Sequence, residues 1–251
     1  MTDIVYTALF GKYENLNERL AFGASSTRYV CFTDDADLKS ESWEIIQAIP
    51  KSPNNASRAS RYIKMLGHRL LPSHSRSLYI DNSVSLKVDG KTLLDSWLVD
   101  TDVAMMKHYR RESVKAEFFI CSAYSLDKQE ILRNQYNFYK KWYPHILAER
   151  PFWGGMIAKV NSPASDRLME TWMNQFDLFS RRDQLSINVS SFISGIPIKM
   201  IDAENDSSEW HTWPIHLNRN LEMRDVYAKS KFRKARVIIT ALTHGVKYYL
   251  P

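Results

Sequence analysis

Asp81 follows the apolar residues Leu78, Tyr79 and Ile80, which are typical of the end of a buried strand. A buried charge without a partner costs several kcal/mol, so this carboxylate must enter a turn, meet a cation or face a ligand. The stretch from 77 to 86, SLYIDNSVSL, is therefore the first candidate for a functional site.

Asp183 and Gln184 form a second polar pair, directly before the apolar residues Leu185, Ile187 and Val189. One interpretation is structural, because aspartate is common at the start of a helix. The other is functional, because a carboxylate and an amide together accept and donate hydrogen bonds to a polyhydroxylated ligand. The residues alone favour neither interpretation.

Two histidines, His211 and His216, flank Trp213 in the segment WHTWPIH. A carboxylate and an imidazole suit Mn²⁺, so either histidine could complete a metal site with Asp81. Histidines in loops are more often ordinary surface residues, and this alternative stays open.

The segment 57–71 predicts an amphipathic helix that ends before Pro72. Its apolar residues share one face, and Arg61, Lys64 and His68 share another. This basic stripe is either a solvated surface or a set of cationic donors for a diphosphate, whose geometry arginine matches with paired hydrogen bonds.

Short β-rich runs alternate with helical segments along the chain. Strands are predicted at 4–10, 29–33, 43–49, 77–81, 103–108, 153–160 and 197–201. Helices are predicted at 57–71, 92–98, 164–179 and 183–194, and one or two helices are predicted over 112–143. This alternation predicts an α/β fold with a mostly parallel central sheet flanked by helices. Ligands of such sheets bind outside the carboxyl ends of the strands, where Asp34, Asp35 and Asp81 stand.

The composition favours one domain with a C-terminal appendage. The chain has 251 residues, of which 44% are hydrophobic. It has no apolar run long enough for a membrane span and no secretory signal, so we expect a cytoplasmic location.

Cys31 and Cys121 stand in apolar segments and are expected to be buried thiols. No P-loop, G-x-G-x-x-G, G-x-S-x-G, C-x-x-C or H-E-x-x-H motif is present. The sequence therefore lacks the commonest motifs of glycine-rich nucleotide-binding loops, serine hydrolases, redox centres and zinc proteases.

Five segments, in this order, carry a resemblance to a known family: YTALFGKYENL, VCFTDD, SRASRYIKMLGHRLLP, SLYIDNSVSL and RRDQLSI. The chain resembles a plant and bacterial family, once labelled a domain of unknown function and now described as glycosyltransferase-like, with some likeness to family 8 glycosyltransferases. The resemblance spans residues 3–200 and implies a glycosyltransferase-A-like (Rossmann-like) fold. We expect a catalytic domain of this fold over 1–222, followed by a basic amphipathic segment over 223–251 that the residue pattern itself indicates.

The resemblance also assigns residues to a nucleotide-sugar donor. The first strand and Asp34 would hold the base, the basic helix would hold the ribose and diphosphate, and Asp81 would bind a divalent cation. The nucleotide-binding residues implied in this way are Thr7, Ala8, Leu9, Phe10, Asp34, Arg58, Arg61, Lys64, Asp81 and Ser83.

Three further assignments follow from the same resemblance. Asp183 and Gln184 are similar to a catalytic pair that faces the donor sugar. His216 would be a metal ligand together with Asp81. The donor and acceptor pocket would include Trp153, Gly154 and Gly155.

The element Asp81-Asn82-Ser83 departs from the family pattern, because serine stands where a second metal-binding carboxylate is expected. A neutral hydroxyl is a weaker ligand for a hard cation. Two alternatives follow. Mn²⁺ or Mg²⁺ binds at Asp81, or the basic residues Arg58, Arg61 and Lys64 neutralise the diphosphate while Asp81 binds ribose or a basic side chain.

The implied function is transfer of a sugar from a nucleotide-diphosphate sugar, with UDP as the favoured nucleotide, to a glycan or lipid-linked glycan in surface polysaccharide synthesis. Retaining and inverting chemistry, and hexosyl and pentosyl transfer, stay open. Alternatives from other classes are a non-catalytic transferase fold and a nucleic-acid-binding module. The latter is suggested by the net charge of +6, but the aromatic residues lie in apolar segments and do not alternate with basic residues.

Basic and apolar residues alternate over 224–239 near the C-terminus. A cationic amphipathic segment of this kind can bind an anionic membrane surface, which would place the protein at the inner face of the membrane as a peripheral protein. A final helix with a solvated basic face is the alternative.

Overall fold

The computed structural model describes residues 2–18, 26–53 and 55–215. Within them, a central sheet has the strand order β3-β2-β1-β4-β7-β6-β8. Its strands are β1 (Thr2–Leu9), β2 (Arg28–Thr33), β3 (Glu44–Gln47), β4 (His74–Ile80), β6 (Val103–Lys107), β7 (Phe152–Val160) and β8 (Lys199–Ile201). Every pairing in it is parallel except the two made by β7, which runs antiparallel to β4 and β6. The predicted α/β class with a mostly parallel sheet is confirmed.

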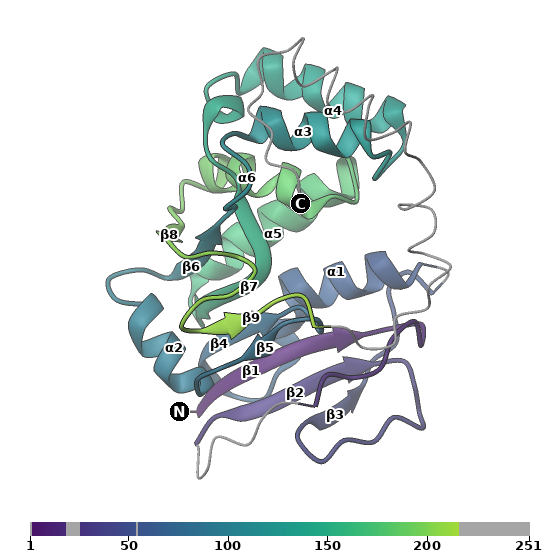
Figure 1. Cartoon of the computed structure of the whole chain (residues 1–251), viewed down its shortest axis with the longest axis vertical. Helices are drawn as coiled ribbons and strands as arrows, with labels where there is room; N and C mark the ends of the chain where they lie inside the picture. The colour runs from purple at the N-terminus through teal and green to yellow at the C-terminus, as the bar shows by residue number, and fades with distance from the viewer. Residues whose placement is uncertain (1, 19–25, 54, 216–251) are drawn as a thin grey trace.

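The helices lie close to their predicted positions (Figure 1). The segment 112–143 is two helices, α3 (Val114–Ala123) and α4 (Gln129–Trp142), and 183–194 is a 3₁₀ turn, Asp183–Leu185, followed by α6 (Ile187–Ser194). The other helices are α1 (Ala56–Leu66), α2 (Gly90–Trp97) and α5 (Pro163–Leu178). No helix in these described ranges is long and apolar enough to cross a membrane.

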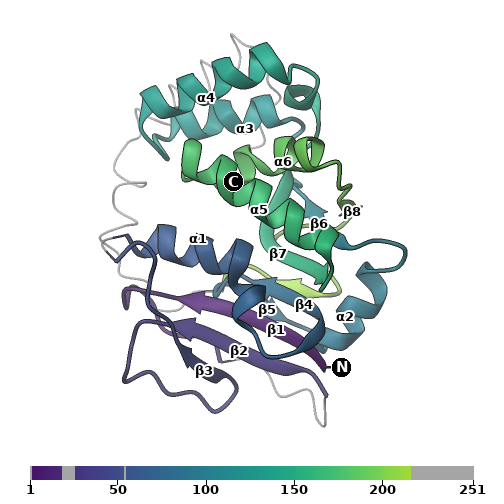
Figure 2. The ribbon, with the colours of Figure 1, turned by 180° about the vertical axis from the view of Figure 1, so that it is seen from behind.

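The two faces of the sheet are covered by different elements. Along β1, Ile4, Tyr6 and Ala8 pack in one core cluster, and Val5 and Leu9 pack in another, as the two-residue period of a strand requires. Helices α1 and α5 lie side by side over the first face (Figure 2). The second face is covered by α2 and by the small sheet of β5 (Ser85–Leu86) and β9 (His211–Thr212).

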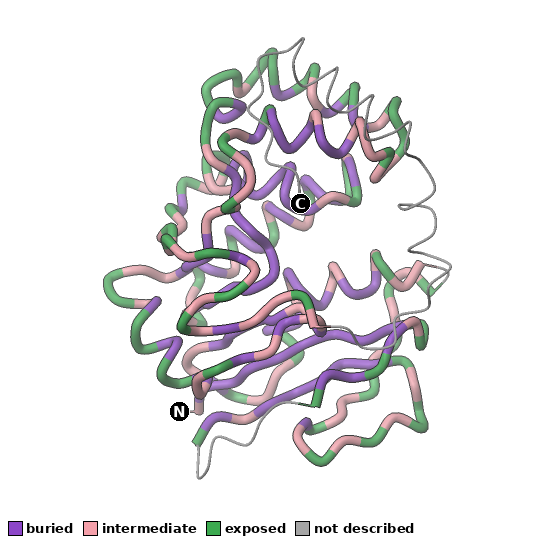
Figure 3. Tube along the Cα trace, in the orientation of Figure 1, coloured by how far each residue is buried: buried purple, intermediate pink, exposed green. Residues whose placement is uncertain are grey.

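A third core cluster joins α3, α4 and α6 beyond the sheet. Figure 3 shows buried backbone along the central strands and on the inner side of α3, while exposed positions follow the outer side of α4. The carboxyl ends of β1 and β4 therefore lie between the sheet with α1 on one side and the cluster of α3, α4 and α6 on the other.

A side-chain cap fixes the start of helix α1. The side chain of Asn55 accepts a hydrogen bond from the backbone N–H of Arg58 (3.0 Å), which satisfies one free donor of the first turn. Ala59 and Ile63 are buried against the sheet. Lys64 is also buried, at 1% exposure, although the sequence pattern places it on a basic stripe. A buried lysine needs a carboxylate partner, which the site supplies.

A buried polar chain crosses the core under α1. The Lys159 ammonium lies 2.7 Å from the Tyr6 hydroxyl and 3.1 Å from His68 Nδ1, and His68 Nε2 lies 2.7 Å from the Asp166 carboxylate. Because Nδ1 accepts from the ammonium, His68 carries its proton on Nε2 and donates it to Asp166. Burial lowers the pKa of Lys159 to about 7.

We expect Lys159→Met to remove a pH dependence of stability. Lys159 is protonated in the unfolded chain up to about pH 10, but in the folded protein it loses its proton from about pH 7 upward. The unfolded chain binds more protons in this window, so stability rises with pH. The contribution of Lys159 to the free energy of unfolding should increase by about 2 kcal/mol between pH 7 and pH 9.

Urea denaturation of both proteins at the two pH values measures this difference. Between pH 7 and pH 9, the free energy of unfolding should increase more in the wild type than in Lys159→Met. An equal pH dependence in the two proteins would show that Lys159 is not the group responsible.

Candidate functional site

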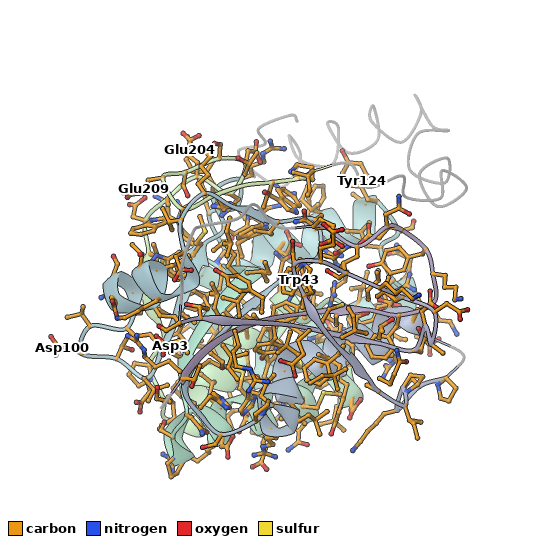
Figure 4. The ribbon with its side chains drawn as sticks, turned by 90° about the horizontal axis from the view of Figure 1, so that it is seen from below. Asp3, Trp43, Asp100, Tyr124, Glu204 and Glu209 are labelled. Carbon is orange, nitrogen blue, oxygen red and sulfur yellow. The ribbon has the colours of Figure 1, made fainter. Side chains whose placement is uncertain are left out.

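A cavity of about 390 Å³ lies at the carboxyl ends of β1 and β4. Its walls come from α1, from the residues that follow β4 and β6, from the first part of β7, from the turn at 182–184, and from Asn205, Asp206 and Trp213 of the late loop. From the same loop, Glu204 and Glu209 lie at the periphery of the molecule (Figure 4). The loop therefore turns part of its polar side chains inward and the rest to solvent.

Asp81 stands at the end of β4 and faces this cavity. Its backbone N–H donates to the Gly155 carbonyl (2.9 Å), which continues the pairing with β7 by one residue. One carboxylate oxygen accepts from the Tyr79 hydroxyl (2.9 Å) and lies 3.7 Å from the Lys64 ammonium. The side chain is 28% exposed, so this strand-end carboxylate has both a cationic neighbour and access to a ligand.

Asn82 fixes the chain beside this carboxylate. Its side-chain amide donates to Glu14 Oε1 (2.9 Å) and to the Asn15 carbonyl (2.9 Å), and its oxygen accepts from the Asn17 N–H (2.9 Å). All of its amide atoms are thereby committed to the segment 14–17.

Ser83 lines the cavity, and its hydroxyl accepts from Trp213 Nε1 (3.1 Å). Of the D-x-D-like element, Asp81 alone presents a carboxylate to the cavity.

The centre of the cavity wall is a buried cluster of one carboxylate and two cations. Asp183 Oδ2 lies 2.6 Å from the Lys64 ammonium and 3.1 Å from Arg61 Nε. The side chains of Lys64 and Asp183 are only 2% and 4% exposed. Burial alone would raise the pKa of Asp183, but Arg61, Lys64 and Arg182 outweigh it and hold this pKa well below its usual range. Asp183 is therefore a permanent carboxylate at neutral pH.

The backbone around Asp183 is held from two sides. Its carbonyl accepts from Trp172 Nε1 of α5 (3.0 Å) and from the Ser186 hydroxyl (3.1 Å). The Gln184 N–H donates to Asp183 Oδ1 (3.1 Å). The structural interpretation from the sequence, a residue at a helix start, and the functional one are thus compatible, because the turn Asp183–Leu185 precedes α6 and also lines the cavity.

Gly154 leaves the space that this ion pair fills. A Cβ at this position would stand 2.8 Å from the Lys64 ammonium nitrogen and 3.4 Å from Asp183 Oδ2. Any side chain here would therefore displace Lys64. Trp153 and Gly155, the other residues predicted for the pocket, line the same cavity.

The other predicted nucleotide-binding residues divide between the cavity and its surroundings. Arg61, Lys64, Ala8 and Ser83 line it. Leu9 lines an adjoining cavity that shares Glu14 with the first one.

Four other predicted positions lie elsewhere. Thr7 and Phe10 are buried in the core, and Asp34 accepts a hydrogen bond from the Gly11 N–H (2.9 Å). Arg58 bonds to Asp177 of α5 (3.2 Å) and does not line the cavity.

Sequence reasoning missed the opposite wall of the cavity. His108, Arg110 and Arg111 directly follow β6, and Arg182 directly precedes Asp183. Glu117 of α3 faces them. The signal was present, because the polar run HYRRE stands just past a predicted strand end, the position that also singled out Asp81.

The described residues do not fit a divalent cation well. They hold no group of three or more histidine, cysteine, aspartate or glutamate side chains placed for a metal. Asp81 has an ammonium group 3.7 Å away, and the Ser83 hydroxyl is engaged with Trp213. His216, the other predicted ligand, lies outside the described residues. His211 is buried, and its Nε2 bonds to the Asn205 carbonyl (2.8 Å).

We expect Lys64→Met to lower the free energy of unfolding by about 3 kcal/mol, because a buried carboxylate loses its nearest cation while Arg61 remains. The double variant Lys64→Met with Asp183→Asn should recover most of this loss, since the uncompensated charge is gone. Arg58→Ala, which breaks an exposed pair on the same helix, should cost less than about 1 kcal/mol. Chemical denaturation measures all three. A double variant no more stable than Lys64→Met would contradict the assignment.

Comparison with curated proteins finds two relatives from Arabidopsis thaliana. A probable hexosyltransferase, MUCI70, is 24% identical over 210 residues, which are 74% of this chain and 36% of that protein. An alkaline ceramidase, TOD1, is 28% identical over 130 residues, which are 42% of this chain and 28% of that protein. The matched region thus spans about a third of the length of these relatives.

Solved structures with partial likeness include three glycosyltransferases. The galactosyltransferase LgtC, solved with donor and acceptor sugar analogues, has a TM-score of 0.47 at 12% identity and covers 79% of this chain and 73% of that one. Mouse xyloside xylosyltransferase 1 has a TM-score of 0.44 at 10% identity, with 80% and 84% covered. The bifunctional glycosyltransferase WbbM has a TM-score of 0.45 at 14% identity, with 80% and 38% covered.

The family match covers most of this chain. Residues 2–193 match the family described as the TOD1/MUCI70 glycosyltransferase-like domain, and this range includes the cavity wall from Ala8 through Asp183 and Gln184. The resemblance stated from the sequence is confirmed. The chain belongs to the TOD1/MUCI70 glycosyltransferase-like family.

Proposed function

We propose that the cavity binds a nucleotide-diphosphate sugar, with UDP as the nucleotide, and that the protein transfers the sugar to an acceptor hydroxyl. The observation behind this proposal is the buried cluster of Arg61, Lys64 and Asp183 beside Asp81, in one cavity at the carboxyl ends of β1 and β4. It supplies cations for a diphosphate and a fixed carboxylate for the sugar. Membership in a glycosyltransferase-like family supports the same reaction.

In this proposal Arg61 and Lys64 stabilise the negative charge that develops on the diphosphate as the bond from the anomeric carbon to its oxygen breaks. Both cations are held before the donor arrives, so little reorganisation is needed during the reaction. Asp81 then has two roles open to it, a hydrogen bond to ribose or a ligand to Mn²⁺ or Mg²⁺. Because the described residues offer a cation few ligands, we place the diphosphate on Arg61 and Lys64.

Asp183 is proposed to face the sugar ring together with Gln184. A carboxylate with a strongly lowered pKa is a poor general base, because its affinity for a proton is small. It is well suited to stabilise positive charge on the anomeric carbon, or to attack that carbon directly. We therefore assign Asp183 an electrostatic or nucleophilic role and not that of a base toward the acceptor.

The acceptor is proposed to be a glycan or lipid-linked glycan of a surface polysaccharide. The basic segment 224–239, which would bring the chain to an anionic membrane, lies outside the described residues, as does all of the predicted appendage 223–251. The name of the second relative points to a different reaction, hydrolysis of a ceramide, so turnover assays should include a ceramide beside nucleotide sugars.

A thermal-shift panel tests the donor assignment. We expect UDP to raise the melting temperature more than GDP, ADP, CDP or dTDP, because a ligand that binds only the native state stabilises it. The shift should persist in EDTA, since Arg61 and Lys64 are the proposed partners of the diphosphate. Arg61→Gln should weaken UDP binding about tenfold or more, as expected for loss of a charge-assisted hydrogen bond.

Arg58→Gln is the matched control, because Arg58 lies on the same helix and bonds to Asp177 outside the cavity. It should bind UDP as the wild type does. A shift that needs Mn²⁺ would move the diphosphate to a metal at Asp81. No shift with any nucleotide would overturn the donor proposal and favour a non-catalytic transferase fold.

We expect Asp183→Asn to lower the turnover of a nucleotide sugar by about 100-fold or more, the usual effect of removing one electrostatic group from a reacting centre. Because the pKa of Asp183 is lowered, the rate should show no loss from this group down to about pH 4. Initial rates across pH measure both. Full turnover in Asp183→Asn would exclude the assigned role.

A further inference from the structure

Three arginines meet at the end of the cavity away from α1. Arg110 and Arg111 come from the segment after β6, and Arg182 comes from the segment after α5. Arg61 and Lys64, the proposed partners of the donor diphosphate, come instead from α1. Arg182 helps to lower the pKa of Asp183, but the proposed donor function uses neither Arg110 nor Arg111, so their presence in the cavity needs a separate explanation.

The three arginines share three carboxylates at this end. Glu117 pairs with Arg111 (2.9 Å) and lies 3.8 Å from Arg182, Asp206 pairs with Arg110, and Asp183 acts on Arg182 electrostatically. His108 beside them adds no charge at neutral pH, because burial lowers its pKa to about 4. Among the described residues, the salt-bridge contact of Arg182 with Glu117 is longer than a hydrogen bond, so this guanidinium is incompletely paired.

Two buried polar atoms at this end also lack hydrogen-bond partners. Among the described residues, Arg182 Nε is buried without a hydrogen-bond partner, and so is His108 Nδ1. A buried polar atom of this kind costs free energy unless a water or a ligand completes it. Both atoms belong to side chains that line the cavity.

The segment after β6 is held in place before any ligand binds. Arg150 donates to the backbone carbonyls of His108 (3.4 Å) and Arg111 (3.1 Å), and the Tyr109 N–H donates to Asn205 Oδ1 (2.7 Å). A binding site on such a fixed segment loses little entropy when it is occupied.

A purely structural role explains Arg111 better than it explains Arg110. Glu117 is 2% exposed and needs a cation, which Arg111 supplies with its Nε. Arg110 bonds instead to Asp206, which is 48% exposed and does not require a partner.

We propose that this end of the cavity binds an anionic group of the acceptor, the carboxylate of a uronic acid or the phosphate of a sugar phosphate. The planar guanidinium groups of Arg110 and Arg182 present paired N–H donors to either oxyanion. This inference rests on the proposed function, which places the donor at the α1 end and leaves this end for the acceptor.

Titrations of the full chain with simple sugars, followed by ligand-observed NMR in the presence of UDP, test the proposal. D-glucuronate and D-glucose 6-phosphate are the anionic probes, and D-glucose is the neutral one. At least one anionic probe should bind about tenfold more tightly than glucose, and the tighter of the two identifies the anion. Arg182→Gln and Arg110→Gln should each reduce this preference about tenfold.

Arg181→Gln is the matched control. Arg181 neighbours Arg182 in the chain but bonds to the Leu126 carbonyl and does not line the cavity. Arg110→Gln should fold even if Arg182→Gln does not, because the partner of Arg110, Asp206, is half exposed while Arg182 faces buried Glu117. Equal affinity for charged and neutral sugars, or wild-type binding by both variants, would overturn the proposal.

The UDP shift separates this inference from the proposed function. UDP binding without preference for an anionic sugar would leave the donor proposal standing and remove only the acceptor inference. A preference for the anionic sugar without UDP binding would support the anion site and overturn the donor proposal.

Discussion

The buried contact between Lys64 and Asp183 sets the conditions for the whole cavity. Each charge would be costly to bury alone, so each fixes the position of the other, and through them α1 is tied to the turn before α6. Gly154 is needed between them because any side chain would displace the lysine. The low exposure of the pair also keeps water away, which strengthens its field on a bound ligand.

The reversed strand β7 makes this contact geometrically possible. It pairs with β4 on one side and with β6 on the other, and it places Trp153, Gly154 and Gly155 beside the ends of both parallel neighbours. Asp81 donates its N–H to Gly155, so the first candidate residue is held by the same strand. Core packing on the α1 and α5 face then determines how deep Lys64 lies.

The sequence predicts the elements well because their signals are local. Period-two burial in β1, the Asn55 cap and the strand-end position of Asp81 depend only on neighbouring residues. It does not predict that Lys64 is buried while Arg58 turns away to Asp177, because both occupy the basic side of one helix and only the packing of α5 distinguishes them.

The same limit applies to the arginine wall of the cavity. Arg110 and Arg182 are 72 positions apart in the sequence, so no local pattern indicates that they line the same cavity. The antiparallel placement of β7 is equally invisible, since its composition is that of any buried strand. Both features depend on contacts between residues far apart in the sequence, which the local pattern of one sequence does not reveal.

Strand β7 also lies between two groups of cavity residues that come from different parts of the sequence. One wall of the cavity comes mainly from residues before α2, and the other comes mainly from residues after β6, with β7 as the partition between them. The pair of Lys64 and Asp183 joins the two walls, so a substitution at either residue of this pair acts on both.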